Sequence, residues 1–195
     1  MENEMDMQRQ SQSQPGRLKR PGSGLIVVDI QERLLPAMFE KERVTRNAAR
    51  LAKGAAILGI PVFATEQYRK GLGATVPEVA GAISHFDPIE KFAFSACGAP
   101  AFMAALKAGQ VSSALLCGIE AHVCVTQTCL DLLEEGMGVF VAADAVSSRA
   151  PDDCRLGLDR MRQAGAVIVS TEMALFEWLG QAGTEEFRQI LGLVK

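Results

Sequence analysis

Three chemically active residues each stand at or shortly after the end of a predicted strand. Asp29 follows the run 25–28, Lys91 closes the segment 85–91, and Cys124 lies shortly after the run 112–117. A thiol, a carboxylate and an ammonium group can together supply a nucleophile, a proton acceptor and a charge that holds both. The types and order of these residues indicate covalent catalysis by a cysteine.

The segment around Cys124 has the pattern of a strand, a tight turn and a helix. Residues 112–117 form a short apolar run, Gly118 breaks it, and apolar residues then recur at helical spacing as far as Gly136. This places Cys124 in the first turn of the helix. A thiol there faces unpaired backbone N–H groups and the positive end of the helix dipole, which favour the thiolate and an oxyanion formed beside it.

The elements that must position these residues alternate between strand and helix along the chain. Such alternation predicts a three-layer, Rossmann-like α/β fold, with a six-stranded parallel sheet and helices on both faces. Ligands of such sheets bind outside the carboxyl ends of the strands, where all three residues are expected. The expected strands are 25–28, 61–65, 85–91, 112–117, 139–142 and 166–169.

Composition limits the possible classes of protein. The chain has 195 residues, 48% of them hydrophobic, and we expect one domain over 24–195 after a flexible leader over 1–23 that is rich in Gln, Ser, Met and Arg. A net charge of −3 gives no electrostatic case for nucleic acid or a membrane surface, and no apolar run approaches the roughly 20 residues of a membrane span. Five cysteines without the spacing of a disulfide framework predict a reducing, cytoplasmic location.

The seven residues 118–124, Gly-Ile-Glu-Ala-His-Val-Cys, resemble the cysteine elbow of the isochorismatase-like cysteine hydrolases. That superfamily also has an Asp at the end of its first strand and a Lys at the end of its third, which Asp29 and Lys91 match. The residues around Cys124 and those of the segment 142–145 are most similar to the isochorismatase domain-containing subgroup. The three matches occur in the same order and span nearly the whole chain from about residue 24.

The resemblance implies a role for each residue. Cys124 would be the nucleophile, Asp29 would carry the thiol proton to the leaving amine, and Lys91 would stabilise the thiolate and orient the pair. The backbone N–H groups of Cys124 and Glu120 would form the oxyanion hole, with the bond between Ile119 and Glu120 in the cis form. The implied reaction is hydrolysis of a small amide or ureido C–N bond through a thioester.

Other functions remain open from the sequence. The chain could be a non-catalytic interaction domain or a redox-active thiol protein on the same fold, or it could hydrolyse a vinyl ether as isochorismatases do. The resemblance implies a small-molecule substrate and a homo-oligomer. The expected helices also carry more apolar residues than packing against one face of the sheet requires, and this excess favours an oligomer. The residues are Phe102, Met103, Phe176 and Trp178.

The loop 65–73 separates this chain from the metal-dependent nicotinamidases of the superfamily, which carry an Asp-and-His cluster there. This loop has no histidine and two cationic residues, so we expect no metal and no cofactor. Gln67 and Tyr68 of the loop, together with Gln31, are the candidates for holding polar substrate groups.

The remaining histidines and cysteines are expected to be structural. His122 is two residues from Cys124, a spacing at which helical side chains do not face each other, and His85 lies at the wrong end of its strand. Three cysteines fall within apolar strands or stripes, which is typical of core thiols, and Cys97 is undecided. The three are Cys117, Cys129 and Cys154.

Overall fold

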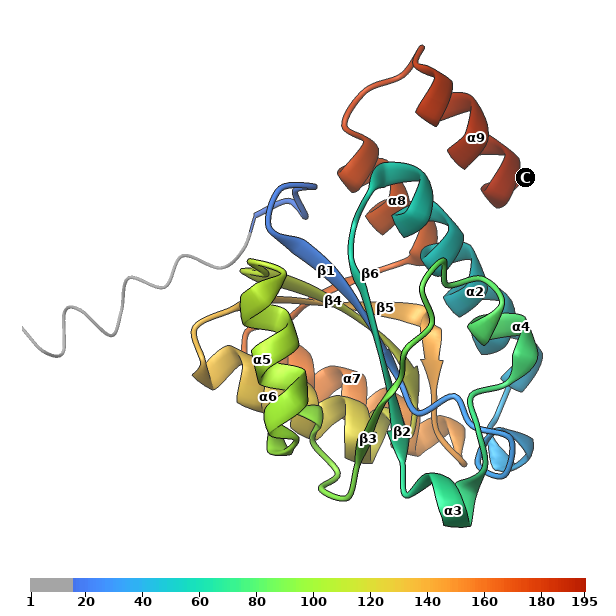
Figure 1. The fold of residues 1–195 in the computed structure, drawn as a ribbon, viewed down its shortest axis with the longest axis vertical. Coiled ribbons are helices and arrows are strands. Elements are labelled where there is room, and N and C mark those ends of the chain that lie inside the picture. The colour runs from blue at the N-terminus through green and yellow to red at the C-terminus, as the bar shows by residue number, and fades with distance from the viewer. Residues whose placement is uncertain (1–15) are drawn as a thin grey trace, which may run out of the picture.

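A computed structural model of the chain describes residues 16–195 as one parallel sheet covered on both faces by helices (Figure 1). The six strands are β1 (Ser23–Val28), β2 (Val62–Gln67), β3 (Ile89–Lys91), β4 (Ser113–Ile119), β5 (Gly138–Ser147) and β6 (Val167–Val169). Their order across the sheet is β3-β2-β1-β4-β5-β6, and every neighbouring pair is parallel. The predicted three-layer α/β fold is confirmed.

Helices of two sets cover the two faces of the sheet. One set packs on one face and consists of α2 (Lys41–Leu58), α4 (Pro77–Ala80), α8 (Thr171–Leu179) and α9 (Glu185–Val194). The other set is α5 (Pro100–Ala108), α6 (Thr126–Glu134) and α7 (Pro151–Gln163). The short segments are α3 (Arg69–Leu72), the 3₁₀ turns η1 (Leu35–Ala37) and η2 (Ala96–Gly98), and the π-helical turn η3 (Ala121–Val125).

The central strands β1 and β4 are buried on both faces, as continuous apolar runs in parallel sheets require. Leu25 and Val27 of β1 point into the core under α2, while Ile26 and Val28 point into the core under α5 and α6. This alternation follows from the period of two in strand side chains. The two cores together fix β1 and β4 against rotation and slippage.

The strand order reverses between β1 and β4. From β1 the chain adds β2 and β3 on one side, and it then crosses over to add β4, β5 and β6 on the other. Loops that leave the carboxyl ends of β1 and β4 therefore diverge, which opens a crevice at this point. Asp29 follows β1 and Cys124 follows β4, so both lie at the reversal.

Three predicted boundaries need correction. The third strand begins at Ile89 rather than near residue 85, and the fifth extends from Gly138 to Ser147 rather than over 139–142. Helix α8 is capped by Ser170, whose side chain accepts the Met173 N–H, one residue before the expected cap at Thr171. The predicted cap at Thr184 is confirmed by its bond from the Phe187 N–H.

The packed part of the chain begins before the expected boundary at residue 24. Leu18 is fully buried, and its N–H donates to the Glu177 carboxylate at 2.7 Å. Arg20 forms an ion pair with Glu186 at 3.0 Å. Leu18 and Arg20, which the prediction placed in a flexible leader, thus contact the folded domain, and residues 1–15 lie outside the described part of the chain. Within 16–195 no helix combines the length and hydropathy needed to cross a bilayer.

Candidate active site

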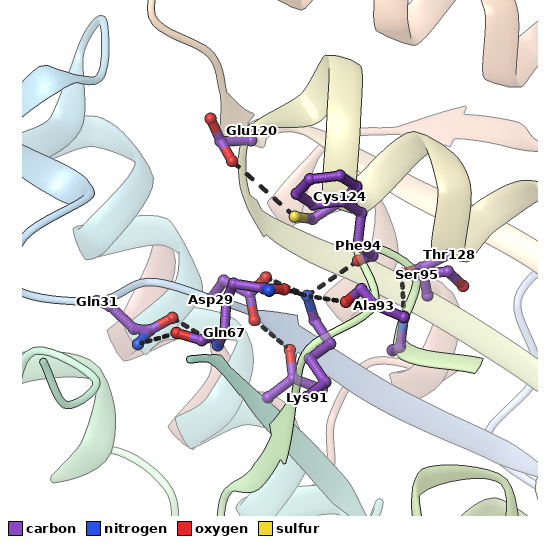
Figure 2. Close-up of polar contacts among 12 residues, drawn as sticks. Asp29, Gln31, Gln67, Lys91, Ala93, Phe94, Ser95, Glu120, Cys124 and Thr128 are labelled. Atoms are coloured by element: carbon purple, nitrogen blue, oxygen red, sulfur yellow. Dashed lines mark hydrogen bonds and ion pairs between the residues drawn. The ribbon is translucent and has the colours of Figure 1, made fainter. Parts of the chain in front are cut away.

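The structure brings Asp29, Lys91 and Cys124 together at the carboxyl edge of the sheet (Figure 2). Asp29 is the first residue after β1, Lys91 is the last residue of β3, and Cys124 lies in the π-helical turn after β4. Strand β2 separates β1 from β3, so the ion pair of Asp29 and Lys91 reaches across it. The convergence expected from the strand ends is therefore present in the geometry.

Asp29 is almost wholly buried, and its two carboxylate oxygens have different surroundings. Oδ1 accepts a hydrogen bond from Thr65 Oγ1 at 2.7 Å, whereas Oδ2 lies 2.6 Å from Lys91 Nζ. Oδ2 has no hydrogen-bond donor among the described residues apart from this ionic contact. A buried carboxylate oxygen with spare acceptor capacity is suited to take a proton from a nearby thiol.

Lys91 is also buried, and its ammonium group is fixed by three oxygen acceptors besides Asp29. Nζ donates to Gln67 Oε1 at 2.7 Å, to the Phe94 carbonyl at 2.9 Å and to the Ala93 carbonyl at 3.3 Å. The two carbonyls belong to the loop that follows β3, which folds back over the lysine. A buried ammonium needs such partners because desolvation is costly.

Cys124 is 1% exposed, so its thiol is almost completely removed from solvent. Burial, and then the charge of Asp29, raise the pKa of the Cys124 thiol to about 12 against the opposing charge of Lys91. Burial and the charge of Asp29 therefore oppose the thiolate that the start of the helix was expected to favour. The nucleophile must be formed by proton transfer during the reaction, and Asp29 is the base in position to do it.

Strand β4 approaches β1 so closely that only glycine fits at position 118. A Cβ on Gly118 would lie 2.2 Å from the Val28 carbonyl oxygen, and its φ of 139° is in the region that side chains rarely adopt. The next turn is π-helical and packs against Gly157 of α7, where a Cβ would lie 2.8 Å from the Ala121 carbonyl oxygen. Such turns are frequent at functional sites. Gly118 and Gly157 together fix where the Cys124 side chain stands.

The predicted cis bond between Ile119 and Glu120 is wrong, because every peptide bond within residues 16–195 is trans. Glu120 instead adopts a left-handed conformation, with φ 57° and ψ 58°, and this turns the chain from the strand into the π-helical turn without a cis bond. Without the cis bond, the reason to expect the Glu120 N–H at the oxyanion no longer holds. We keep the Cys124 N–H as the predicted oxyanion donor and do not assign the Glu120 amide.

A second polar cluster beside Cys124 was missed by the sequence analysis. The Glu120 carboxylate pairs with the Arg149 guanidinium through Oε1, and its Oε2 lies 4.0 Å from Cys124 Sγ. His122 contacts Ser148 Oγ at 2.9 Å and Arg149 at 3.4 Å, so its ring belongs to this cluster. The feature that could have indicated this cluster is Arg149. It follows the fifth strand closely, because that strand continues to Ser147.

The three candidate substrate-binding residues have different positions. Gln31 is fully buried and clamps two loops, since its amide group donates to the Gly73 and Gln67 carbonyls and accepts the Gln67 N–H. Gln67 holds Lys91 through Oε1 and donates to the Phe92 carbonyl. Tyr68 is exposed, and its ring centroid lies 5.9 Å from that of Phe92. Gln31 and Gln67 thus have positioning contacts, and only Tyr68 presents a free side chain.

In the segment 65–73, where no metal site is expected, the carboxylate Glu66 is occupied by contacts with protein groups. Glu66 is buried, accepts the N–H and hydroxyl of Thr75, and pairs with Arg69 at 3.3 Å. No group of three or more His, Cys, Asp or Glu residues capable of holding a metal occurs within residues 16–195. The absence of metal remains a prediction.

The other four cysteines differ in burial and in the charges near them. Cys154 lies near the Arg43–Glu40 ion pair, and burial raises the pKa of its thiol. Cys117 and Cys129 are fully buried in the core, as predicted, and burial raises the pKa of the Cys129 thiol to about 12. Cys97 and Cys154 are only partly buried, and burial raises the pKa of the Cys97 thiol to about 11. All four are free thiols.

Comparison with known proteins agrees with this geometry. The family model described as "Isochorismatase domain" matches residues 23–173, which contain Asp29, Lys91 and Cys124. The chain is 41% identical to "Isochorismatase domain-containing protein 2" of Danio rerio over 92% of this chain and 90% of that one. The alignment therefore extends over most of both chains.

Solved structures with the same fold include proteins described in three different ways. The chain resembles "MAR1 Ribonuclease" from Caenorhabditis elegans, with a TM-score of 0.87, 38% identity and 92% coverage of both chains. It also resembles YcaC from Pseudomonas aeruginosa "with hexane-2,5-diol and covalent acrylamide", with a TM-score of 0.84, 28% identity and 91% coverage of both. The ycaC gene product of Escherichia coli, "an octameric hydrolase of unknown specificity", has a TM-score of 0.83, 25% identity and coverage of 93% and 89%. The chain belongs to the isochorismatase family, a family of hydrolases.

Proposed function

We propose that this protein is a cysteine hydrolase that cleaves a small amide or ureido C–N bond through a thioester on Cys124. The observation that carries the proposal is the meeting of a buried thiol, a buried carboxylate and a buried ammonium at the point where the strand order reverses. Burying an ion pair is expensive and rarely adds stability by itself. Its presence beside a thiol therefore favours a catalytic role for Asp29 and Lys91.

The reaction begins with transfer of the Cys124 proton to Asp29 Oδ2. The sulfur then bonds to the carbonyl carbon and its double bond opens to an oxyanion. When this intermediate collapses, the C–N bond breaks and Asp29 returns the proton to the departing nitrogen. Water then attacks the thioester, its proton passing to Asp29, and the acid is released as the proton returns to the sulfur. The carboxylate ends each cycle unchanged.

Lys91 and Thr65 act on this chemistry through Asp29. Thr65 fixes one carboxylate oxygen and thereby orients the other, while the Lys91 charge stabilises each negative group as it forms. Because Lys91 is held by three other acceptors, it keeps its position when Asp29 becomes protonated. The Cys124 N–H at the start of the helix is the proposed donor to the oxyanion.

The related proteins support a nucleophilic cysteine in this fold. The Pseudomonas aeruginosa YcaC structure is described as carrying covalent acrylamide, a small amide that forms bonds with nucleophiles, and the Escherichia coli protein is described as a hydrolase. The Caenorhabditis elegans protein is described as a ribonuclease. The net charge of −3 and the two carboxylates beside the thiol disfavour a phosphate-rich substrate here, and RNA is included below as a test.

The alternative functions are less well matched to the geometry. A redox-sensing thiol needs an exposed thiolate, whereas Cys124 is buried and burial raises the pKa of its thiol. Vinyl-ether hydrolysis gives no reason for the thiol to lie beside Asp29. A non-catalytic interaction domain gives no reason for the buried Asp29–Lys91 pair.

The test is turnover of a panel of small primary amides, ureido compounds, a vinyl ether and a short RNA, with product release measured for wild type and Cys124→Ala. Release of ammonia or amine that is lost in Cys124→Ala supports the proposal. Cleavage of the vinyl ether or RNA that survives in Cys124→Ala would overturn it. So would accumulation of only a sulfenate or mixed disulfide on Cys124.

We also propose that the protein acts as a homo-oligomer on a small molecule in the cytoplasm. The four apolar residues that favoured an oligomer do not carry this argument, because Phe102 and Trp178 are buried in the core of the chain itself. The support lies in exposed aromatic residues around the Lys91 loop, where Phe92 is 71% and Phe94 is 53% exposed. Sedimentation at micromolar concentration tests it, and a monomer of 20.9 kDa would contradict it.

A further inference from the structure

Cys124 has a second carboxylate beside it that the proposed reaction does not use. Glu120 is 9% exposed, and its Oε2 lies 4.0 Å from Cys124 Sγ (Figure 2). This oxygen has no other hydrogen-bond partner among the described residues. A carbonyl group attacked by the sulfur must enter the same space, so a neighbouring substituent of that carbon would meet Glu120 Oε2.

Arg149 holds the Glu120 carboxylate in place from the side away from the thiol. The guanidinium pairs with Oε1, and its second nitrogen contacts His122 Nε2 at 3.4 Å. His122 is in turn fixed by Ser148 at 2.9 Å. The cluster therefore aims one carboxylate oxygen at the nucleophile and uses the other as an anchor.

The charges around the sulfur restrict what can bind there. Asp29 and Glu120 are both negative, and each is paired with its own cation, Lys91 and Arg149 respectively. A substrate carboxylate next to the scissile carbon would be repelled by Glu120. An N–H group at the same place would instead donate to Oε2 in a charge-assisted hydrogen bond.

Resting on the proposed function, we infer that Glu120 is a specificity-determining residue, which selects substrates that carry a free N–H donor on the group beside the scissile carbonyl. The substrate class is then narrowed to unsubstituted amides and ureas. N,N-dialkyl amides and carboxylate-bearing compounds are rejected, since the first leave Oε2 unpaired and the second bring a like charge against it. Asp29 Oδ2 is the other free carboxylate oxygen beside the sulfur, and the proposed reaction uses it for proton transfer, which leaves Glu120 Oε2 to accept from such a group.

A test that does not depend on hydrolysis uses alkylation of Cys124 by small acrylic compounds. In this reaction the sulfur bonds to the β-carbon, the thiol proton ends on the α-carbon, and nothing leaves. The probes are acrylamide, N,N-dimethylacrylamide and acrylate, each rate being divided by that for glutathione. Peptide mass spectrometry then measures the adduct on Cys124, with Cys124→Ala as the blank.

We expect wild type to prefer acrylamide over N,N-dimethylacrylamide by about ten-fold or more after this correction, as loss of a charge-assisted hydrogen bond implies. In Glu120→Ala the corrected rates for acrylamide and N,N-dimethylacrylamide should differ by no more than about two-fold. Glu120→Gln, which keeps the side-chain volume and one acceptor, should give an intermediate ratio. Glu134→Ala, which removes an exposed carboxylate at the far end of α6, should keep the wild-type ratio.

An unchanged preference in both Glu120 variants would overturn the assignment, as would faster corrected reaction of acrylate than of acrylamide in wild type. The second result would show Arg149 to be an anion receptor. Thermal unfolding of each variant identifies any that fails to fold, and Glu120→Gln then decides alone. Failure of the proposed function would appear differently, as alkylation with the predicted preference but no turnover of any amide.

Discussion

Lys91 Nζ lies 2.6 Å from Asp29 Oδ2 across the strand that separates their own strands. The intervening β2 supplies one partner to each charge, because Thr65 donates to Asp29 and Gln67 accepts from Lys91. Thr65 and Gln67 are two residues apart and so lie on the same face of the strand. Strand β2 thus holds the two charges at a fixed separation.

Removing one member of this buried pair should destabilise the protein strongly. Asp29→Asn or Lys91→Met should each lower the free energy of unfolding by about 3–5 kcal/mol, since each leaves a buried charge without its counter-ion. The double variant should lose less free energy of unfolding than the sum of the two single losses. Urea denaturation measures the free energy of unfolding of all three variants. Arg188→Met, in an exposed pair with Glu185, is the control and should change little. Strict additivity of the two single changes would contradict the coupling.

Gly118→Ala should lower the free energy of unfolding by more than about 3 kcal/mol, because the new methyl group meets the Val28 backbone in a region of φ closed to alanine. The matched control is Gly136→Ala, whose φ of 78° is also positive but whose Cβ would enter open space. That variant should lose only about 1–2 kcal/mol. Equal losses in chemical denaturation would show that close approach of β4 to β1 is not the constraint.

Stability should fall as the pH rises from about 9 to 12. Burial raises the pKa of Cys129 to about 12, so in this window the native thiol keeps a proton that the unfolded chain releases. The contribution of the protonated Cys129 thiol to the free energy of unfolding is therefore complete below pH 9 and is lost as the pH approaches 12. Cys129→Ala should make the decline shallower by up to about 1.4 kcal/mol per pH unit. An identical slope in urea titrations of both proteins would contradict this account.

Chelation should leave the enzyme unaffected. Glu66, near the end of β2, binds Thr75 and Arg69 through its carboxylate, and the described residues offer no metal-ligand cluster. Hydrolysis rate and unfolding temperature should therefore be unchanged after dialysis against EDTA. Stoichiometric zinc or iron that leaves together with activity would show that the metal prediction is wrong.

Much of the fold and of the site followed from the sequence, because apolar runs ending in polar residues fix both the sheet and its active edge. Asp29, Lys91 and Cys124 were placed at this edge in this way, and their catalytic roles stay a prediction. The raised pKa of the Cys124 thiol was not predicted, since burial depends on packing that no local pattern records. The trans bond before Glu120 was also missed, because the left-handed conformation of that residue achieves the turn by another route.

The contacts of Gln31 and Gln67 could not be predicted from spacing alone. Both side chains join loops that follow different strands, and the sequence does not show which loops face each other. Arg149 was missed because the fifth strand was expected to end near residue 142 and continues to Ser147. Only the full register of β5 against β4 brings it beside Glu120.

The measurement that tests the central claim most directly is acid quenching of the protein during reaction with p-nitrophenyl acetate, followed by peptide mass spectrometry. The account predicts one acetyl group, on Cys124, formed within the first turnover, absent from Cys124→Ala and formed more slowly in Asp29→Asn. Cys97 and Cys154 are less buried and serve as internal controls that should stay unmodified on this timescale. Acetylation of those two cysteines with none on Cys124, or an unchanged rate in Asp29→Asn, would contradict a nucleophile activated by Asp29.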